Sequence, residues 1–360
     1  MRIAISTGGG DAPGLNAVIR AAVLAAVKRG WEIFGIRRGF GGLLGDASEL
    51  VPLGPRDVRG ITHLGGTILG TTNRGNPFRW PMKQPDGTMK EVDRSDELIE
   101  QFRRHSLDAL IMVGGDGSLR IGHDLWRKGL PIVGVPKTID NDVGGTVITF
   151  GYDTAVTTAT DAIDKLHSTA ESHDRVMVVE VMGRHAGWIA LNSGLAGSAD
   201  VILIPEIPYD IEKVCDKVRE REAQGRHYTI VVAAEGAVPQ GGSVIVKEQA
   251  GVGTVERLGG VGERVAAGIA ERTGKETRSL VLGHLQRGGT PTTFDRLLGL
   301  RFGAAAVRAI AEGKFGQMVA ADPPTITIVP LAEALSQPKR VPIDSDSVQT
   351  ARELGVCLGD

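Results

Sequence analysis

The sequence predicts an α/β fold of two doubly wound domains with mainly parallel sheets. Three features of its 360 residues support this prediction. Short apolar runs rich in β-branched residues recur along the chain, amphipathic stretches separate them, and glycine-rich polar loops follow most of the runs. This alternation is typical of parallel sheets whose two faces are covered by helices. Because the chain exceeds the usual length of one domain, we expect two.

The short apolar runs are the predicted strands, since strands buried on both faces read as continuous apolar segments. They lie at residues 2–6, 32–36, 109–113, 131–135, 176–181, 201–204, 229–233, 280–283 and 326–330. Between them, apolar residues recur at spacings of three and four, which favours helices packed on a sheet. The predicted helices are residues 15–29, 161–168, 211–223, 261–272 and 295–312. Residues 73–95 are polar and rich in turn-forming residues, and we expect them to form an excursion over the surface.

Composition narrows the function classes. Lys and Arg number 41 against 43 Asp and Glu, so the formal net charge of −2 gives no overall field that favours nucleic acid or a membrane surface. The two cysteines, Cys215 and Cys357, form no metal-binding or disulfide motif, which fits a reducing cytoplasm. There is no signal-peptide pattern and no apolar run long enough to span a membrane. We therefore expect a cytoplasmic protein that acts on small molecules.

Three loops that follow predicted strands carry residues suited to phosphate chemistry, because ligands of open parallel sheets bind beyond the carboxyl ends of the strands. The first is Gly8-Gly9-Gly10-Asp11-Ala12-Pro13-Gly14, whose backbone amides can surround a phosphate. It is not a Walker loop, because Leu15-Asn16 follow it, and not a dinucleotide fingerprint, because Pro13 replaces the last glycine. Taken alone, this loop is equally consistent with a plain strand-to-helix turn.

The second loop is Gly114-Gly115-Asp116-Gly117-Ser118. An aspartate flanked by glycines at a strand end can hold Mg²⁺ beside a polyphosphate without obstruction by other side chains. The motif indicates phosphoryl transfer more firmly than it indicates a substrate, and an Asp-Gly turn is its alternative.

The third loop is Thr138-Ile139-Asp140-Asn141-Asp142, directly after Lys137. One of its two carboxylates can accept a hydroxyl proton while the other adjusts the local charge or the metal binding. Lys137 supplies a cation for phosphate, which weighs against the alternative of a capped Asx turn.

Several arginines lie in or beside segments at the strand ends, and guanidinium groups bind phosphate oxygens through paired, charge-assisted hydrogen bonds. A substrate that already carries a phosphate is therefore indicated. The arginines are Arg74, Arg175, Arg184, Arg278 and Arg287. Any one of them taken alone is more often a solvated surface charge, just as Glu235 and His284 taken alone are more often structural.

Five segments, in this order, resemble the phosphofructokinase family. They are residues 9–16, 114–118, 136–142, 181–184 and 283–289. The resemblance covers about residues 1–320, and the five motifs together are far more specific than any one of them. It implies a phosphoryl-donor domain of residues 1–150 plus about 290–335 and a fructose 6-phosphate domain of about 151–289, with the active site in the cleft between them. Residues 336–360 would form a C-terminal tail that packs on the second domain.

The resemblance also implies roles for individual residues. Asp140 would be the base that takes the proton of the sugar 1-hydroxyl, with Thr138 and Asp142 beside the transferring phosphoryl group. Arg184, together with Thr138, would stabilise the charge that develops on this group. Asp116 matches the magnesium-associated aspartate. The implied donor-binding residues are Gly10, Arg74, Gly115, Gly117, Ser118 and Lys137.

For the acceptor sugar, the resemblance implies contacts from both domains. The residues are Thr138, Asp140, Met182, Gly183, Arg184, Glu235, His284 and Arg287. Arg175 and Arg278 would reach the sugar phosphate of the neighbouring subunit. A homodimer or a homotetramer with shared substrate sites follows, and the sequence does not choose between the two.

Two positions bear on the phosphoryl donor. Family members that use ATP usually carry glycine at the positions of Gly117 and Lys137, whereas those that use pyrophosphate usually carry aspartate and lysine. This chain carries the glycine of the ATP users at residue 117 and the lysine of the pyrophosphate users at residue 137. Because a side chain at residue 117 would obstruct the α-phosphate and the adenosine, its absence favours ATP.

We therefore predict an ATP-dependent 6-phosphofructokinase of glycolysis, in which Mg²⁺ assists transfer of the γ-phosphoryl group to fructose 6-phosphate, giving fructose 1,6-bisphosphate. One alternative is the pyrophosphate-dependent form of this enzyme. Another is a non-catalytic sensor that binds a sugar phosphate or a nucleotide. The presence of Asp116, Asp140 and Arg184 argues against the sensor, because binding alone needs no proton acceptor beside the hydroxyl group.

Overall fold

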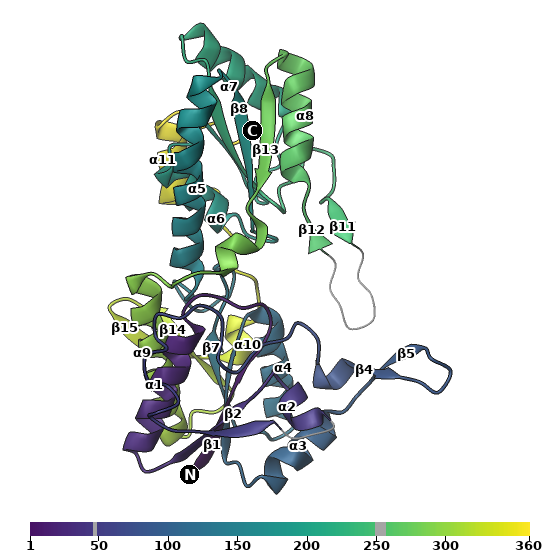
Figure 1. Cartoon of the computed structure of the whole chain (residues 1–360), viewed down its shortest axis with the longest axis vertical. Helices are drawn as coiled ribbons and strands as arrows, with labels where there is room; N and C mark the ends of the chain where they lie inside the picture. The colour runs from purple at the N-terminus through teal and green to yellow at the C-terminus, as the bar shows by residue number, and fades with distance from the viewer. Residues whose placement is uncertain (46–48, 249–256) are drawn as a thin grey trace.

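The computed structural model covers residues 1–360 and describes all of them except 46–48 and 249–256. Two α/β units lie one above the other along the long axis of the molecule (Figure 1). The first unit surrounds a seven-stranded sheet and contains the N-terminus, and the second surrounds a four-stranded sheet and contains the C-terminus. The predicted α/β class with mainly parallel sheets is confirmed.

The sheet of the first unit contains seven strands. They are β1 (Arg2–Thr7), β2 (Glu32–Ile36), β3 (Leu50–Leu53), β6 (Ala109–Gly114), β7 (Ile132–Pro136), β14 (Gln317–Asp322) and β15 (Thr325–Pro330). Their order in the sheet is β15-β14-β7-β6-β1-β2-β3. Only the edge strands β3 and β15 run antiparallel to their neighbours. Every residue of β6 and β7 is buried, because helices cover both faces of this sheet.

Helices from distant parts of the sequence cover the first sheet. One face carries α1 (Leu15–Lys28) and α9 (Thr293–Ala311), and the other carries α2 (Gly41–Leu44), α3 (Ser95–Arg104) and α4 (Asp116–Arg127). The short α10 (Leu331–Ala334) lies beside β14 and α4.

Helices α1 and α9 approach each other at backbone distance. A Cβ atom on Gly303 of α9 would lie 2.3 Å from the carbonyl oxygen of Val18 in α1. Only glycine permits this approach, so the residue identity fixes how the two helices pack. A helix that follows the whole second sheet in sequence is therefore part of the core of the first unit.

The second sheet is entirely parallel, in the order β13-β8-β10-β9. Its strands are β8 (Val176–Val181), β9 (Val201–Leu203), β10 (Thr229–Ala234) and β13 (Thr277–Val281). One face carries α5 (Tyr152–Ser172), α6 (Trp188–Ala196) and α11 (Asp346–Glu353), and the other carries α7 (Ile211–Ala223) and α8 (Val261–Thr273). Cys215 is buried in α7 among these core residues, as expected for a packing cysteine.

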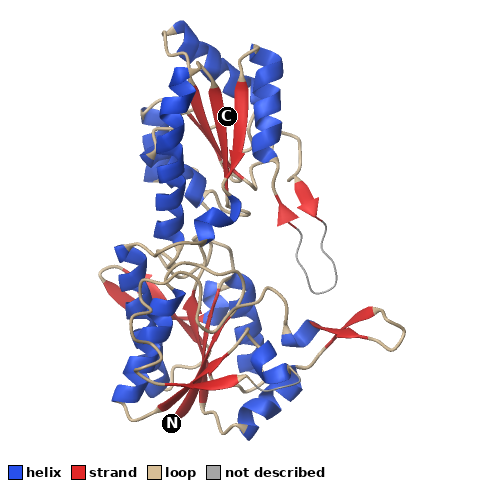
Figure 2. Cartoon of the chain, viewed as in Figure 1, coloured by secondary structure: helices blue, strands red, loops and turns tan. Residues whose placement is uncertain are grey.

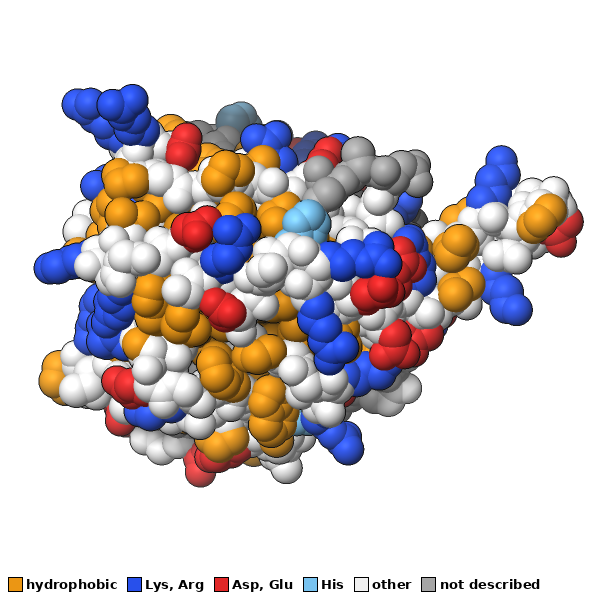
Figure 3. Space-filling view, turned by 90° about the horizontal axis from the view of Figure 1, so that it is seen from below, with side chains coloured by type: hydrophobic (Ala, Val, Ile, Leu, Met, Phe, Trp, Pro, Cys, Tyr) orange, Lys and Arg blue, Asp and Glu red, His pale blue; other side chains and the backbone are white. Residues whose placement is uncertain are grey.

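Two small ribbons extend from the units (Figures 1 and 2). Strands β4 (Trp80–Lys83) and β5 (Met89–Val92) form an antiparallel hairpin after the short helix η1 (Pro77–Arg79). Seen from below, this hairpin projects far beyond the body of the first unit (Figure 3). It is the excursion predicted for residues 73–95. The second ribbon pairs β11 (Val246–Glu248) with β12 (Arg257–Leu258).

Of the last 25 residues, 336–360, the first few contact the first unit, and those from Val341 on lie against the second. Val341, Val348 and Leu358 are buried in the core beside α6. The backbone of Cys357 forms a parallel β-bridge with Val201 at the start of β9. Among the described residues, no helix combines the length and the apolar character that a bilayer crossing needs.

Eight of the predicted strands match the observed ones to within one residue at each end. The strand predicted at 280–283 was placed wrongly, because the strand is Thr277–Val281 and Gly283 begins the 3₁₀ helix η2 (Gly283–Arg287). Gly283 has a φ angle of 49°, which ends an extended strand. The helix predicted at 161–168 is the middle of the longer α5.

Candidate active site

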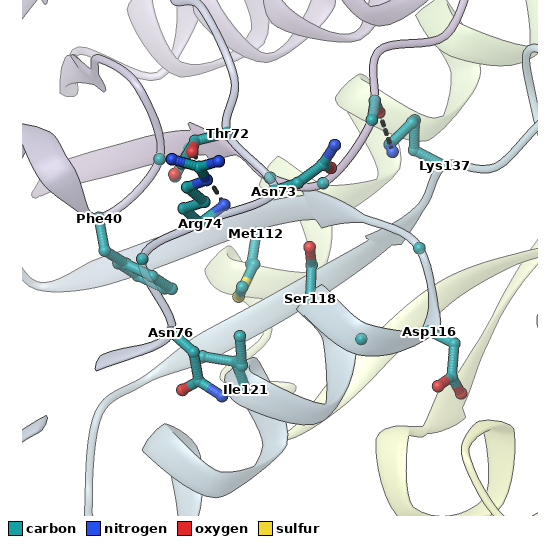
Figure 4. Close-up of a pocket in the computed structure, with 18 of the residues that line it drawn as sticks. Phe40, Thr72, Asn73, Arg74, Asn76, Met112, Asp116, Ser118, Ile121 and Lys137 are labelled. Carbon is teal, nitrogen blue, oxygen red and sulfur yellow. Dashed lines mark hydrogen bonds between the residues drawn. The ribbon is translucent and has the colours of Figure 1, made fainter. Parts of the chain in front are cut away.

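Three loops meet at the carboxyl ends of the neighbouring strands β7, β6 and β1. These are the segments predicted to bind phosphate, residues 8–14, 114–118 and 137–142. Together with residues 72–76 they enclose a cavity of about 420 Å³ (Figure 4). Parallel strands end at the same edge of a sheet, so the strand order alone brings these distant segments together.

Glycine is required in two of these loops by the close approach of Ser118. A Cβ atom on Gly114 would lie 2.3 Å from Cβ of Ser118, and one on Gly8 would lie 2.9 Å from its Oγ. Ser118 occupies the first turn of α4, where unpaired backbone amides and the helix dipole favour an anion. The geometry therefore suits a phosphate group at the start of this helix.

Lys137 lies at one end of the cavity (Figure 4). Its side chain is 3% exposed, and its ammonium group donates a hydrogen bond to the carbonyl oxygen of Gly10. Burial lowers the pKa of Lys137 to about 8, and the neighbouring Arg287 lowers it as well, against the opposing effect of nearby aspartates. An incoming phosphate would favour the charged form, so Lys137 is suited to pair with phosphate.

The opposite end of the cavity carries three apolar side chains, Phe40, Met112 and Ile121, from three different elements, with the polar Asn76 close by (Figure 4). Arg79 and Glu91, at the base of the hairpin, also line the cavity. Apolar walls with a few polar groups can receive an aromatic ring system. Sequence reasoning missed all six residues, although Phe40 follows a predicted strand in a glycine-rich loop and could have been found from that signal.

Gly117 faces open space between these two ends. No protein atom lies within 4 Å of a Cβ placed on it, and residue 117 is exposed at the cavity wall. A larger side chain here would not disturb the protein but would take space from a ligand. Arg74, Gly10, Gly115 and Ser118 line the same cavity, so all six predicted donor-binding residues, Lys137 included, lie together.

Asp116 begins α4 and lines the cavity, and it forms a two-point ion pair with Arg120 at 2.8 and 3.0 Å. Within the described chain, no group of three or more His, Cys, Asp or Glu residues is arranged to hold a metal. A magnesium ion that arrives with a polyphosphate needs only one or two carboxylates, since phosphate oxygens and water supply the other ligands. Asp116 fits this requirement, because an exposed pair with Arg120 is easily exchanged.

Asp140 lies where the two units meet. Its Oδ1 atom is buried and accepts no hydrogen bond from any residue that the structure describes. Burial raises the pKa of Asp140 to about 6, and Asp142 raises it further, while Arg287, Lys137 and Arg184 oppose the shift. A buried oxygen without a hydrogen-bond donor, surrounded by cations, is suited to accept a proton from a bound hydroxyl group.

The turn that carries Asp140 is held by internal hydrogen bonds. The backbone N–H of Asp140 donates to Oγ1 of Thr138 at 3.1 Å, and Oγ1 of Thr149 donates to the carbonyl of Thr138 at 2.8 Å. Asn141 has a φ angle of 51°, and its Oδ1 accepts from the N–H of Thr149 at 3.1 Å. Asn tolerates this left-handed conformation better than most residues do.

The second unit contributes the loops after β8 and β10. Glu235 follows β10, and its N–H donates to the carbonyl of Val181 at the end of β8. Burial raises the pKa of Glu235 to about 7, with a further contribution from Asp140 and an opposing one from Arg287 and Arg184. Groups of both units thus lie close enough to shift one another's pKa. Met182 and Gly183 precede Arg184 in the same loop.

Arg287 connects the units directly. It belongs to η2 of the second unit, and its Nη1 donates to the carbonyl of Asp11 in the first at 3.1 Å. A Cβ on Gly10 would lie 2.8 Å from that same nitrogen, so glycine at residue 10 makes room for the guanidinium group. Gln286, fully buried beside it, accepts from the N–H of Met182 at 3.3 Å and holds η2 to the end of β8. His284 is exposed on the same helix.

Arg175 and Arg278 lie elsewhere. Arg175 directly precedes β8 and Arg278 pairs with its second residue, so both are at the amino end of the strands. They share Glu276, at 2.9 and 2.6 Å. Because β8 has six residues, this pair lies roughly 17 Å from the loop with Arg184. The structure does not bring them to the site of their own chain.

Asp140, with its unpartnered Oδ1, lies between a cavity suited to phosphate and the arginines Arg184 and Arg287. This arrangement defines a phosphotransferase that works between two α/β units. The chain matches the phosphofructokinase family over residues 2–310. It is 53% identical to the ATP-dependent 6-phosphofructokinase of Chloroflexus aggregans, over 100% of this chain and 98% of that one. It is also 52% identical to the pyrophosphate–fructose 6-phosphate 1-phosphotransferase of Amycolatopsis methanolica, over 95% and 96% of the two chains.

Comparison with solved structures also indicates the phosphofructokinase family. The T-state crystal structure of Pichia pastoris phosphofructokinase superposes with a TM-score of 0.79 at 32% identity, over 99% of this chain. This chain spans 37% of the length of that one. The chain belongs to the phosphofructokinase family.

Proposed function

We propose that this chain is an ATP-dependent 6-phosphofructokinase, which transfers the γ-phosphoryl group of ATP to the 1-hydroxyl of fructose 6-phosphate. The observation that carries the choice of ATP is the apolar end of the cavity. From Lys137 the cavity passes Gly117 and reaches Phe40 and Ile121, with a volume of about 420 Å³. Pyrophosphate has no part that would use an apolar wall, whereas adenosine has one.

In this proposal the first unit, residues 1–150 with about 290–335, holds the donor. The amides of the loops with Gly10 and Gly115, the first turn of α4 and Lys137 orient the phosphates. Asp116 would hold the magnesium ion, which when bound neutralises phosphate charge and orients the transferring group. These contacts position the γ-phosphorus in line with the acceptor hydroxyl.

Asp140 removes the proton of the 1-hydroxyl as its oxygen attacks the γ-phosphorus. The bond between this phosphorus and the bridging oxygen of the β-phosphate breaks, and ADP leaves with that electron pair. Arg184 and Thr138 donate to the oxygens of the group in transfer, and Asp142 sets the charge around Asp140. The sensor alternative is disfavoured, because a buried carboxylate with a raised pKa is costly where no proton has to be accepted.

The second unit, about residues 151–289, holds the acceptor in this proposal. Its sugar contacts are Met182, Gly183, Arg184, Glu235, His284 and Arg287. Arg175 and Arg278 would bind the sugar phosphate in a second copy of the chain, since they lie far from their own site. From Val341 on, the tail of residues 336–360 packs on this unit.

A homo-oligomer, dimer or tetramer, is part of the proposal. Large apolar side chains are exposed on β13, on η2 and at the start of α9, a short stretch that also carries Arg278 and His284. They are Leu280, Val281, Leu285, Phe294 and Leu297, which are 39–69% exposed. Apolar residues gathered in this way mark a surface for a partner subunit. The cytoplasm is the proposed location of the reaction.

Pyrophosphate is the second candidate donor, and Lys137 is the observation that favours it. Its ammonium group lies beside Gly10, where it can pair with the phosphates of either donor. The similar identity to the Amycolatopsis enzyme shows that overall identity does not decide the donor.

The test is formation of fructose 1,6-bisphosphate from fructose 6-phosphate and Mg²⁺, with ATP and pyrophosphate supplied in parallel as the only donor. Product with ATP alone supports the proposal. Product with pyrophosphate alone would mean that pyrophosphate is the donor and that Lys137 determines this choice. No product with either donor would contradict the reaction itself.

A further inference from the structure

The C-terminal tail contacts the loop of Asp140 in the first unit and, in the second unit, two residues that flank or hold the loop of Arg184. The N–H of Lys339 donates to the carbonyl of Asp142 at 2.9 Å, in the loop of the first unit. Two residues later, the N–H of Val341 donates to Glu206 of the second unit at 2.8 Å. We call residues 339–341 the strap, because this short segment connects the two units beside the active site.

The side chain of Lys339 uses all three of its donors on the first unit. Its Nζ donates to Oδ1 of Asn141 at 2.8 Å, to the carbonyl of Thr146 at 3.1 Å and to that of Val147 at 2.7 Å. Such complete pairing is unusual for a lysine, whose ammonium group is normally solvated. The ring of Trp188 in the second unit covers it at 5.6 Å.

Asn141 is the residue through which Lys339 reaches the chemistry. It is 5% exposed and adopts the left-handed conformation between Asp140 and Asp142. Its Oδ1 accepts from both Lys339 and the N–H of Thr149, so the side chain that shapes the turn is fixed from two directions. A shift of this turn would move Asp140 directly.

The strap also holds the loop with Arg184. The carbonyl of Lys339 accepts from Nε1 of Trp188, the first residue of α6, at 3.2 Å. The carboxylate of Glu206 accepts from Val341 and also from the N–H of Gly187, at 3.1 Å to each oxygen. Gly187 ends the loop that contains Arg184. Within three residues, the strap therefore contacts the loop of Asp140 directly and is connected to the loop of Arg184 through Trp188 and Glu206.

We propose that Lys339 is a positioning residue for phosphoryl transfer, which holds Asp140 in place through Asn141 and keeps its loop in register with the loop of Arg184. This inference rests on the proposed function, because it assigns Lys339 to the same reaction. It predicts an effect on turnover rather than on substrate affinity, since Lys339 lines neither the cavity nor the sugar contacts.

The test compares Lys339→Met with Lys314→Met in the full-length protein. Methionine keeps the length of the side chain but donates no hydrogen bond, which leaves three acceptors unpaired. Lys314 is exposed and pairs only with its neighbour Glu312 in the described structure, so its replacement controls for the loss of one lysine charge. We expect kcat of Lys339→Met to fall about 10- to 100-fold, as misplacement of a catalytic group by about 1 Å does, while both KM values and Lys314→Met stay close to wild type.

A double-mutant cycle shows whether the effect passes through Asn141. Asn141→Gly keeps the left-handed turn accessible but removes the acceptor. We expect the loss in the double variant to be close to that of one single variant. Losses that multiply would overturn the route through Asn141.

A purely structural role predicts a different result, in which Lys339→Met lowers the melting temperature and leaves kcat per folded molecule unchanged. That result would overturn the proposal. If Lys339→Met does not fold, Lys339→Gln, which keeps two donors, is measured instead, and an unchanged kcat would again overturn it. Turnover by the wild-type protein is the separate check of the proposed function. Amide hydrogen exchange of residues 138–149 tests the proposal without any turnover. Faster exchange in Lys339→Met supports the proposal, and unchanged exchange contradicts it.

Discussion

The two units of this protein differ in how complete their binding sites are within one chain. The first unit encloses a cavity whose lining glycines, Lys137 and Phe40 all come from the same chain. In the second unit the candidate residues are divided, with Arg184 and Glu235 at the carboxyl ends of the strands and Arg175 and Arg278 at the amino ends. The difference teaches that one chain brings its proposed donor-binding residues together, whereas its proposed acceptor-binding residues are spread over two ends of a sheet, so that the proposed function calls for a second copy.

The largest expected effect is at Asp140, where the two halves meet. Asp140→Ser should lower kcat about 1,000-fold, because it removes the proton acceptor, while affinity for the sugar phosphate persists. The melting temperature at pH 7 should not fall and is expected to rise. The raised pKa of Asp140 means that its charged form is disfavoured in the folded protein. Its ionisation therefore lowers the stability of the fold as the pH rises from the unfolded-state pKa of about 3.9 to about 6, and the full loss is present at pH 7. Steady-state kinetics and calorimetric binding check both points, and loss of sugar-phosphate binding would show that Asp140 acts in binding instead.

The next effect tests the division of the acceptor site. Arg278→Ala should raise KM for fructose 6-phosphate about 10- to 100-fold, as loss of a charge-assisted contact to phosphate does, and leave KM for ATP unchanged. Mixing Arg278→Ala with Asp140→Ser under conditions of subunit exchange should restore activity, because a hybrid contains one intact site. If the mixture does not recover activity, each chain completes its own acceptor site, and the two units do not differ in this respect.

A smaller effect is expected at Gly117, which lines the donor cavity of the first unit. Gly117→Asp should raise KM for ATP about tenfold or more, since the new carboxylate takes space and repels phosphate. The melting temperature should stay within a degree or so, because nothing lies within 4 Å of the new Cβ. Equal KM values for ATP in the two proteins would show that the nucleotide does not pass residue 117.

The smallest effect is the dependence of kcat/KM on pH. Asp140 must be ionised to accept a proton, so activity should rise as the pH passes its pKa of about 6 and should be roughly tenfold lower one pH unit below it. Above the pKa of Lys137, about 8, activity should decline as this residue loses its charge. In Lys137→Arg the decline should disappear, because arginine stays protonated. A decline that persists in this variant would assign the alkaline step to another group.

Much of the fold was predictable because buried strands leave a clear signal. The run Val176–Val181 and the helix Ile211–Ala223 were predicted with their observed bounds, since each is apolar in the pattern that its structure requires. Helix α4 was not predicted, because Asp116–Arg127 has only three buried residues and begins within a loop motif. The strand predicted at 280–283 was displaced because the sequence does not reveal that Thr277–Val281 is an exposed edge.

The site was predictable only where glycine or charge gathered in one loop. Such a loop pointed to Gly10, Gly117 and Asp140, which the structure brings to one edge of a sheet or to the junction of the units. Phe40 lies in a glycine-rich loop after a predicted strand, which was the one available signal, whereas the sequence around Glu91 gives no reason to place it at the cavity, so its position depends on the tertiary fold.

The packing of α9 on α1 has a consequence for the newly made protein. All four strands of the second sheet exist once the ribosome has passed residue 281, whereas the first sheet lacks β14 and β15 until residue 330 has been made. The sheet of the second unit is therefore complete before that of the first, although its last core residues, Val341, Val348 and Leu358, are made after residue 330. Meanwhile α1 and the first strands, complete by residue 136, wait on the order of ten seconds for their last partners at usual translation speeds. During that interval the apolar face that α9 will cover is open to chaperones and to other nascent chains.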